Sequence, residues 1–181
     1  MENRKCQVNL AGIGMGSKGT LTEEVRKIIA ESDVLIGATR MLEGFREKKK
    51  CCYAEYLPEK IRAILDEQEE KTRCTVLFSG DTGFYSGAEA VYKALQEEVR
   101  LGKLQAGITI CPGISSLSYL AARAGKSWQD AKIVSTHGRE ADVTACVRRE
   151  KKVFLIVSGR SDLIRIGEEL EAAGLSGVEL T

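Results

Sequence analysis

Short apolar runs alternate with longer amphipathic segments along this chain. The apolar runs are bounded by glycine or polar residues and predict strands at 8–11, 34–37, 75–78, 107–111, 132–135 and 153–157. Apolar residues at helical spacing predict helices between them, at 21–29, 61–70, 89–95, 114–124, 142–149 and 162–173. Strands that alternate with helices form parallel sheets, so we expect an α/β fold with a largely parallel sheet, or two such sheets.

A polar, glycine-containing segment at 124–130 is the best candidate for a linker between two lobes. We therefore expect an N-terminal α/β lobe over 1–124 and a C-terminal α/β lobe over 125–181. The final run, 178–181, begins like a strand and has no continuation. This pattern predicts a second lobe that is truncated, with an unfinished sheet.

Composition narrows the class of protein. The chain has 181 residues, 43% of them apolar, which is enough for one large domain or two small ones. Its 27 Lys and Arg residues nearly balance 26 Asp and Glu residues, which argues against nucleic-acid or membrane binding. No apolar run approaches the roughly 18 residues of a spanning helix, and the first residues do not resemble a signal peptide.

Cysteine and histidine usage argues against a metal site. The six cysteines form no C-x-x-C pair, and there is one histidine, so neither a zinc site nor a disulfide framework is expected. Free thiols fit a reducing cytoplasm.

The segment 79–87 carries the clearest candidate chemistry. It follows an apolar strand-like run, contains three glycines and one acid, and precedes a helix. Loops of this kind build ligand sites at the carboxyl edge of an α/β sheet. Glycine lets the backbone approach a ligand closely, while Asp81 and Ser86 can fix its polar groups.

The glycine loops can also be compared with those of dinucleotide-binding proteins, P-loop proteins and serine hydrolases. Residues 14–19 match G-x-G-x-x-G, but dinucleotide binding also needs an acid at the carboxyl end of the second strand. Asp33 stands at the right count yet precedes that strand, so the nicotinamide interpretation fails on geometry. The same loop lacks the Gly-Lys-Ser/Thr ending of a P-loop. A serine hydrolase is disfavoured because neither Ser86 nor Ser115 has the G-x-S-x-G spacing.

Three further strand-end loops carry polar groups. Residues 112–116 end in Ser115 and Ser116, which either cap the next helix or bind a carboxylate or ribose, and both roles can hold together. Residues 135–139 contain the lone His137, for which a structural and a functional role are equally open. Residues 158–160 form an analogous loop, for which a structural turn is favoured.

In their order and spacing, the loops at 12–16, 80–86, 112–116 and 136–139 resemble the tetrapyrrole methyltransferase family. These are the S-adenosylmethionine-dependent enzymes of corrin and sirohaem synthesis. The His-Gly-Arg loop and the Asp-Thr-Gly-Phe-Tyr-Ser-Gly sequence are most similar to the branch that methylates C5 of precorrin-6Y and cobalt-precorrin-7. The resemblance covers essentially the whole chain.

The resemblance implies two α/β lobes of tetrapyrrole methylase type with the methyl donor in a cleft between them, a cytoplasmic location and commonly a homodimer. S-adenosyl-L-methionine would be the cofactor and S-adenosyl-L-homocysteine its product. The residues implied for the donor come from the glycine loops and the His-Gly loop: Met15, Gly80, Asp81, Gly83, Phe84, Ser115, Ser116, His137 and Gly138.

The substrate implied by the resemblance carries many carboxylates, for which arginine has the best donor geometry. The expected substrate contacts are therefore Arg139 and Arg160, with Tyr85 and Ser86 from the other lobe. A sulfonium donor is already activated, so transfer depends mainly on alignment. A later proton loss calls for a base, for which His137 and Asp81 are the candidates.

Two alternatives stay open. One keeps the fold and donor but changes the acceptor, as in the diphthine synthase branch. The other is a non-catalytic subunit that binds donor or tetrapyrrole and serves a separate C15-methylating decarboxylase.

Overall fold

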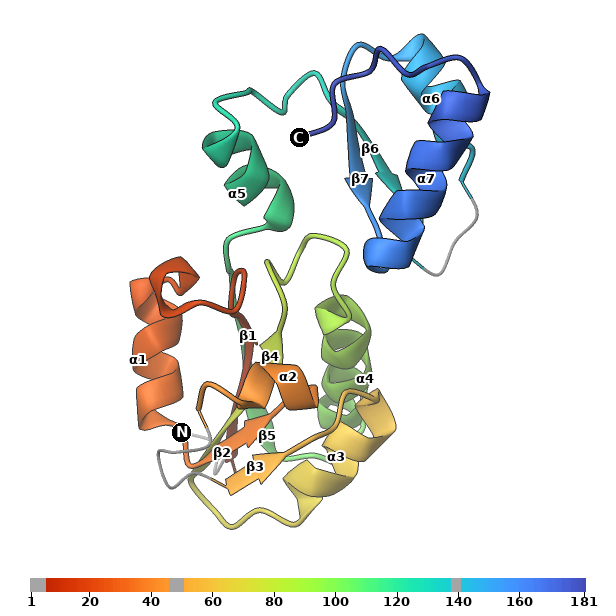
Figure 1. The fold of residues 1–181 in the computed structure, drawn as a ribbon. Coiled ribbons are helices and arrows are strands. Elements are labelled where there is room, and N and C mark those ends of the chain that lie inside the picture. Colours follow the sequence, from red (N-terminus) through yellow and green to blue (C-terminus); the bar gives the residue numbers. More distant parts are fainter. Residues whose placement is uncertain (1–5, 46–50, 138–140) are drawn as a thin grey trace. The chain divides into compact units, whose positions relative to one another are not determined.

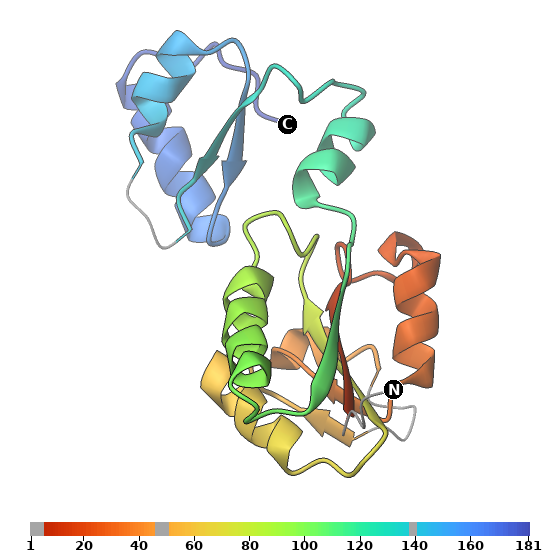
Figure 2. The same cartoon turned by 180° about the vertical axis from the view of Figure 1, so that it is seen from behind.

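The computed structural model describes residues 6–45, 51–137 and 141–181 (Figures 1 and 2). The chain divides into two compact units, Met1–Ser116 and Leu117–Thr181. The lobe boundary expected from the sequence, at 124/125, lies further along the chain, just after a helix. Each unit is an α/β assembly of its own.

The first unit is built on a five-stranded sheet in the order β3-β2-β4-β1-β5. All of its strand pairs are parallel, which confirms the predicted sheet type. Leu10 of β1 stands opposite Val76 of β4 and Ile110 of β5. The strands are β1 (Cys6–Gly12), β2 (Val34–Ile36), β3 (Cys51–Tyr53), β4 (Thr72–Phe78) and β5 (Ala106–Cys111).

Helices cover both faces of this sheet (Figure 1). Leu10 and Val76 point to one face and pack with α3 and α4, whereas Ala11 and Leu77 point to the other and pack with α1 and α2. The near-continuous burial of β1, β2 and β4 follows from this coverage, as is usual for a parallel sheet. The helices are the 3₁₀ turn η1 (Lys18–Thr20), α1 (Glu23–Glu31), α2 (Thr39–Leu42), α3 (Pro58–Asp66) and α4 (Ala88–Arg100).

Local interactions at the start of α1 explain why a helix forms where the sequence pattern predicts one. The Thr22 hydroxyl accepts a hydrogen bond from the Val25 amide at 3.2 Å, and two glutamates occupy the first turn. By contrast, α3 ends at Asp66, short of the predicted residue 70, and the chain turns at Lys71 with a φ of 67°. The sequence also missed β3 and α2, which are only three and four residues long.

The second unit contains a two-stranded parallel sheet, β6 (Lys132–Ser135) and β7 (Val153–Ile156). Its helices include α6 (Val143–Arg149) and α7 (Arg160–Ala172), which share a small core of Val143, Ile166 and Leu170. Helix α5 (Ser116–Arg123) begins at the last residue of the first unit. Residues 178–181 form no strand, contrary to the sequence prediction, and Leu180 is exposed.

Candidate functional site

Three loops follow adjacent strands at the carboxyl edge of the first sheet. They are residues 12–16 after β1, 79–87 after β4 and 112–116 after β5, and β1 lies between the other two strands. Because the strands are parallel, all three loops emerge at the same edge, which is where α/β sheets bind ligands. The sequence identified these loops, and the strand order places them side by side.

The first two loops are joined through their backbones. The Gly14 amide donates to the Gly80 carbonyl at 3.0 Å, and the Gly80 amide donates to the Gly14 carbonyl at 2.8 Å. The Ile13 amide also donates to the Phe78 carbonyl at 2.9 Å. These bonds extend the contact between β1 and β4 beyond the strands and fix the path of both loops.

The third loop approaches the other two so closely that side chains are excluded. A Cβ atom on Gly12 would lie 2.7 Å from both the Gly80 oxygen and the Gly113 nitrogen. A Cβ atom on Gly113 would lie 2.2 Å from the Gly80 oxygen and 2.6 Å from the Gly12 carbonyl. All of these neighbours are backbone atoms, which cannot move aside without shifting a loop. Glycine at 12 and 113 is therefore a steric requirement of the edge.

Asp81 ties the second loop to the third. Its Oδ1 accepts a hydrogen bond from the Gly83 amide at 2.9 Å, and its Oδ2 accepts one from the Gly113 amide at 2.9 Å. The carboxylate thus fixes its own loop and a loop 32 residues away. This bridging contact was not expected from the sequence, which assigned Asp81 to ligand binding or base catalysis.

Met15 lies beside this junction. A Cβ atom on Gly80 would stand 3.8 Å from the Met15 methyl group and 3.9 Å from the Ile114 oxygen, so Met15 and the third loop flank Gly80. The Met15 amide donates to the buried Thr20 hydroxyl at 3.0 Å, and that hydroxyl donates to the Ser17 carbonyl at 2.9 Å. Thr20 therefore shapes the first loop, a role that the sequence pattern gave no sign of.

The tip of the second loop carries two aromatic rings. Phe84 and Tyr85 meet edge to face with centroids 5.1 Å apart. Tyr85 is 55% exposed and has a φ of 48°, an unusual conformation for a bulky residue. The Ser86 hydroxyl accepts from the Ala88 amide at 3.2 Å at the start of α4, so this residue has a structural contact as well as its predicted ligand role.

In the second unit, Asp162 joins two strand-end loops. Its Oδ2 accepts hydrogen bonds from the Thr136 hydroxyl at 2.7 Å and from the Ser158 amide at 3.2 Å. Its Oδ1 pairs with Arg165 at 2.5 Å. The hydrogen bond from Thr136, followed by those from Arg165 and Ser158, lowers the pKa of Asp162 to about 2. The sequence offered one sign of this residue, an acid in the first turn of a helix that follows a strand-end loop.

The remaining predicted residues are distributed over both units. Ser115 and Ser116 lie at the start of α5, in the third loop of the first unit. His137 directly follows Thr136 and is exposed, and Arg160 is the exposed first residue of α7. Gly138 and Arg139 lie outside the described residues. The structure thus brings together Met15, Gly80, Asp81, Gly83 and the third loop, and it places His137 and Arg160 in the other unit.

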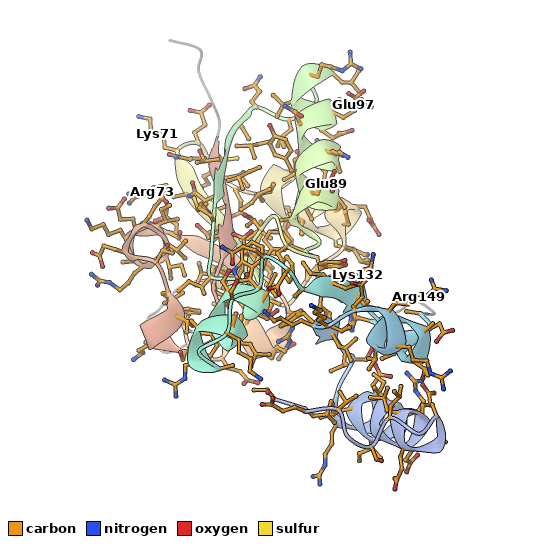
Figure 3. The ribbon with its side chains drawn as sticks, turned by 90° about the horizontal axis from the view of Figure 1, so that it is seen from above. Lys71, Arg73, Glu89, Glu97, Lys132 and Arg149 are labelled. Carbon is orange, nitrogen blue, oxygen red and sulfur yellow. The ribbon has the colours of Figure 1, made fainter. Side chains whose placement is uncertain are left out.

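A groove of about 570 Å³ lies at the opposite edge of the first sheet, where β1, β4 and β5 begin. It is lined by Asp33, Lys71, Arg73 and Thr109, among others, and Figure 3 shows Lys71 and Arg73 pointing outward. Arg73 is engaged there by Glu31 at 3.4 Å and by Asp33 at 3.9 Å. None of the glycine loops contributes to this groove, so we place the candidate site at the carboxyl edge.

The buried cysteines Cys74 and Cys111 are poor nucleophiles, because their thiols stay protonated. The six cysteines are free thiols, and burial raises the pKa of Cys74 to about 12 and also raises that of Cys111. Within residues 6–45, 51–137 and 141–181, no cluster of His, Cys, Asp or Glu could hold a metal ion. No helix in the same ranges is long and apolar enough to cross a membrane.

Comparison with known proteins identifies the family. The sequence model of the Tetrapyrrole (Corrin/Porphyrin) Methylases matches residues 7–179. A probable cobalt-precorrin-7 C(5)-methyltransferase of Methanocaldococcus jannaschii is 27% identical over 154 residues, which cover 82% of this chain and 70% of that protein. The cobalt-precorrin-7 C(5)-methyltransferase of Salmonella typhimurium is 30% identical over 175 residues, which cover 92% of this chain and 79% of that protein.

Solved structures agree on the fold. Cobalt precorrin-4 methyltransferase superposes with a TM-score of 0.69 at 20% identity, covering 94% of this chain and 76% of that one. A uroporphyrin-III C-methyltransferase from Thermus thermophilus, solved with S-adenosyl homocysteine, gives a TM-score of 0.59 at 18% identity, covering 93% and 72%. The predicted α/β fold of tetrapyrrole methylase type is confirmed.

The close approach of the three loops gives a first prediction. Gly113→Ala should destabilise the first unit by about 1–3 kcal/mol or more, because the new methyl group meets immovable backbone. Gly19→Ala is the matched control, since a Cβ atom there would meet nothing within 4 Å. Urea unfolding followed by circular dichroism measures both. Equal stability of Gly113→Ala and the wild type would contradict the steric requirement.

The lowered pKa of Asp162 gives a second prediction. Its carboxyl carbon should titrate in NMR with a midpoint near pH 2, and Thr136→Val should move the midpoint up toward the ordinary value of about 3.9. A lowered pKa stabilises the fold above the unfolded-state pKa. This contribution should therefore be complete above about pH 5 and should disappear as the pH falls from about 4 to 2. A midpoint near 3.9 in the wild type would refute the assignment.

Proposed function

Because the chain belongs to the tetrapyrrole (corrin/porphyrin) methylase family, we propose that it transfers a methyl group from S-adenosylmethionine to C5 of a corrinoid precursor in cobalamin biosynthesis. The proposed acceptor is cobalt-precorrin-7 or precorrin-6Y. The observation that carries the proposal is the similarity to two relatives named for this reaction, over most of both chains.

The residues of the carboxyl edge fit the donor. S-adenosylmethionine supplies an electrophilic methyl group on a positively charged sulfur. The loops at 12–16, 79–87 and 112–116 contain one charged residue, Asp81, and no lysine or arginine, so no cation there would repel it. Glycines leave backbone groups accessible to a ligand. In this proposal the first unit holds the donor through Met15, Gly80, Asp81, Gly83, Phe84, Ser115 and Ser116.

Asp81 acts mainly on the geometry of this site. Its two hydrogen bonds hold the second and third loops at a fixed separation. Carboxylate oxygens have further lone pairs, so Asp81 can accept a bond from a ligand without releasing either amide. A preformed edge suits methyl transfer, because the acceptor carbon, the methyl group and sulfur must be in line and positioning supplies much of the rate.

The second unit contributes the residues for acceptor and proton chemistry in this proposal. His137 and Gly138 contact the donor, and Arg139 and Arg160 bind the acetate and propionate groups of the tetrapyrrole. Tyr85 and Ser86 complete the acceptor contacts from the first unit. His137 is the group proposed to take the proton that C5 loses after methylation, because an unprotonated imidazole nitrogen can accept a proton and the residue is exposed.

The proposed setting rests on the nature of the substrate, on the free thiols and on the family resemblance. The tetrapyrrole is a small-molecule substrate, and neither nucleic acid nor a membrane is needed as a partner. We place the protein in the cytoplasm as a homodimer. A separate C15-methylating decarboxylase is the proposed partner, because a decarboxylating precorrin-6Y C(5,15)-methyltransferase of Sinorhizobium sp is 28% identical over 177 residues, which cover 95% of this chain and 41% of that protein.

The third prediction tests the donor and the acceptor together. The protein should bind S-adenosylhomocysteine in calorimetry and should add one methyl mass to cobalt-precorrin-7 in the presence of S-adenosylmethionine. Asp81→Ala should weaken donor binding by about tenfold or more, because it releases two amides from a charged acceptor. Asp81→Asn, which keeps one carbonyl oxygen, is the control and should lose less.

Three outcomes would count against the proposal. Binding of a nicotinamide dinucleotide without S-adenosylhomocysteine would contradict the donor. Donor binding without turnover would favour a non-catalytic subunit, and turnover of another acceptor would replace the corrinoid. An unchanged affinity of Asp81→Ala for S-adenosylhomocysteine would contradict the role of the Asp81 carboxylate but not the proposed reaction.

The fourth prediction concerns the strained aromatic residue of the second loop. Tyr85→Gly should raise the KM for the tetrapyrrole by about tenfold, because a large exposed ring that stacks on a planar ligand is removed. Its stability should stay close to that of the wild type, because relief of the positive φ, worth about 1–3 kcal/mol, offsets the lost edge-to-face contact with Phe84. Tyr85→Phe keeps the ring and should retain most of the affinity. A stable Tyr85→Gly variant with unchanged KM would rule out acceptor contact by this residue.

A further inference from the structure

The carboxyl ends of β6 and β7 are connected by a single side chain. Thr136 follows β6, Ser158 lies just after β7, and both donate hydrogen bonds to the same oxygen, Oδ2 of Asp162. The Thr136 amide also donates to the Ile156 carbonyl at 2.9 Å, which continues the pairing of β6 and β7 by one residue. Asp162 therefore meets both loops just where they leave the sheet.

Burial indicates that this contact determines local geometry. Thr136 is 9% exposed and the Asp162 side chain 14% exposed, although the latter carries a charge. A shielded carboxylate needs its hydrogen bonds, since an unpaired one is costly to bury. Among the described residues of this unit, Val143, Ile166 and Leu170 form a small buried cluster, and Val157, the first residue after β7, packs against it partly buried. Hydrogen bonds to Asp162 thus hold Thr136 and Ser158, neither of which belongs to this cluster.

The other oxygen of Asp162 has a different partner. Oδ1 pairs with Arg165 one helical turn further on, and Arg165 also pairs with Glu169 at 2.6 Å. Arg165 is half exposed, and exposed ion pairs of this kind contribute little. The two sides of the carboxylate can therefore be tested separately.

The first unit contains the same device. Asp81 also follows a strand, and it accepts one amide from its own loop and one from a neighbouring strand-end loop. Asp162 does the equivalent with a hydroxyl from the loop after β6 and an amide from the loop after β7. In both units a carboxylate joins two loops that hold predicted ligand-binding residues.

We propose that Asp162 is a positioning residue for methyl transfer, whose carboxylate holds Thr136 and Ser158 so that the nearby His137 and Arg160 are presented to the ligands. The inference rests on the proposed function and deepens it, because no site residue had been assigned within α7 beyond its first position. Asp162 itself touches neither donor nor acceptor and acts through the loops that it joins.

Four variants separate positioning from other effects. Asp162→Asn removes the charge and weakens the contact, and Thr136→Val removes the hydroxyl donor while keeping the shape. Thr136→Ser keeps a hydroxyl donor at this position, and Arg165→Gln removes only the ion pair on the opposite oxygen. For each variant, KM for cobalt-precorrin-7, kcat and the Kd of S-adenosylhomocysteine are measured on the full chain, with thermal unfolding alongside.

Positioning predicts a specific pattern. Asp162→Asn and Thr136→Val should lower kcat/KM by about tenfold or more, since small misplacements of binding groups are costly to transfer. Thr136→Ser and Arg165→Gln should stay close to the wild type. Kinetic constants in Asp162→Asn and Thr136→Val that match those of Arg165→Gln would overturn the proposal. A loss of kcat/KM in Thr136→Ser as large as that in Thr136→Val would also overturn it.

A second readout keeps this test independent of the proposed function. Amide hydrogen exchange of Ser158 and Thr136 should accelerate in Asp162→Asn but not in Arg165→Gln, whether or not the protein turns over a corrinoid. Unchanged exchange at both amides would overturn the positioning role. An inactive wild type with accelerated exchange in Asp162→Asn would instead count against the proposed function and leave the loop contact intact.

Discussion

The carboxyl edge of the first sheet depends on the contact of three backbones. Gly12, Gly80 and Gly113 come from three neighbouring strands and approach so closely that a methyl group on Gly12 or Gly113 would overlap backbone atoms. This approach needs parallel strands in the order β4-β1-β5, so that all three loops leave the sheet at one level. It replaces side-chain bulk with amide and carbonyl groups, which suits a site that recognises a ligand largely through its backbone.

Backbone contact pairs the Gly14 and Gly80 amides with each other's carbonyls, whereas the Gly83 and Gly113 amides use side-chain acceptors. Carboxylates supply them. Asp81 accepts two amides from different loops, and Asp162 accepts a hydroxyl and an amide from different loops of the second unit. Hydrogen bonds to a charged acceptor are stronger than those between neutral groups, and here they join polar groups of separate loops. Rigid loops and a few charged side chains are therefore combined in each unit.

This arrangement agrees with the chemistry of the family. Methyl transfer from a sulfonium donor depends on alignment, so a site can be built from glycine loops without a metal ion or an activated nucleophile. Asp81 then has a structural task that is compatible with donor binding. The strained, exposed Tyr85 fits a contact residue better than a scaffold residue, because strain of this kind is concentrated at functional sites.

Several elements could be predicted because their causes are local. Strand β6 was predicted with its observed bounds, and α1 was predicted from the helical spacing of its apolar residues, since periodicity acts within a few residues. By contrast, the three-residue β3 is held by its pairing with β2, and α3 ends at Asp66, short of the predicted residue 70, with a turn at Lys71 that the composition did not reveal. Short elements carry too little pattern to be recognised before their neighbours are known.

The same division applies to the candidate site. By itself the sequence determined the alternating α/β pattern, the positions of the glycine loops and the family that these loops resemble. Each strand, helix or loop motif is a short run of neighbouring residues, so it can be recognised without knowing which runs meet in space. Only the tertiary structure decided that Gly12, Gly80 and Gly113 touch, that Asp81 reaches Gly113 and that Asp162 joins Thr136 to Ser158. Those contacts join residues as far apart along the chain as Gly12 and Gly113, and they exist only once the order of the parallel strands has brought their loops to a common edge.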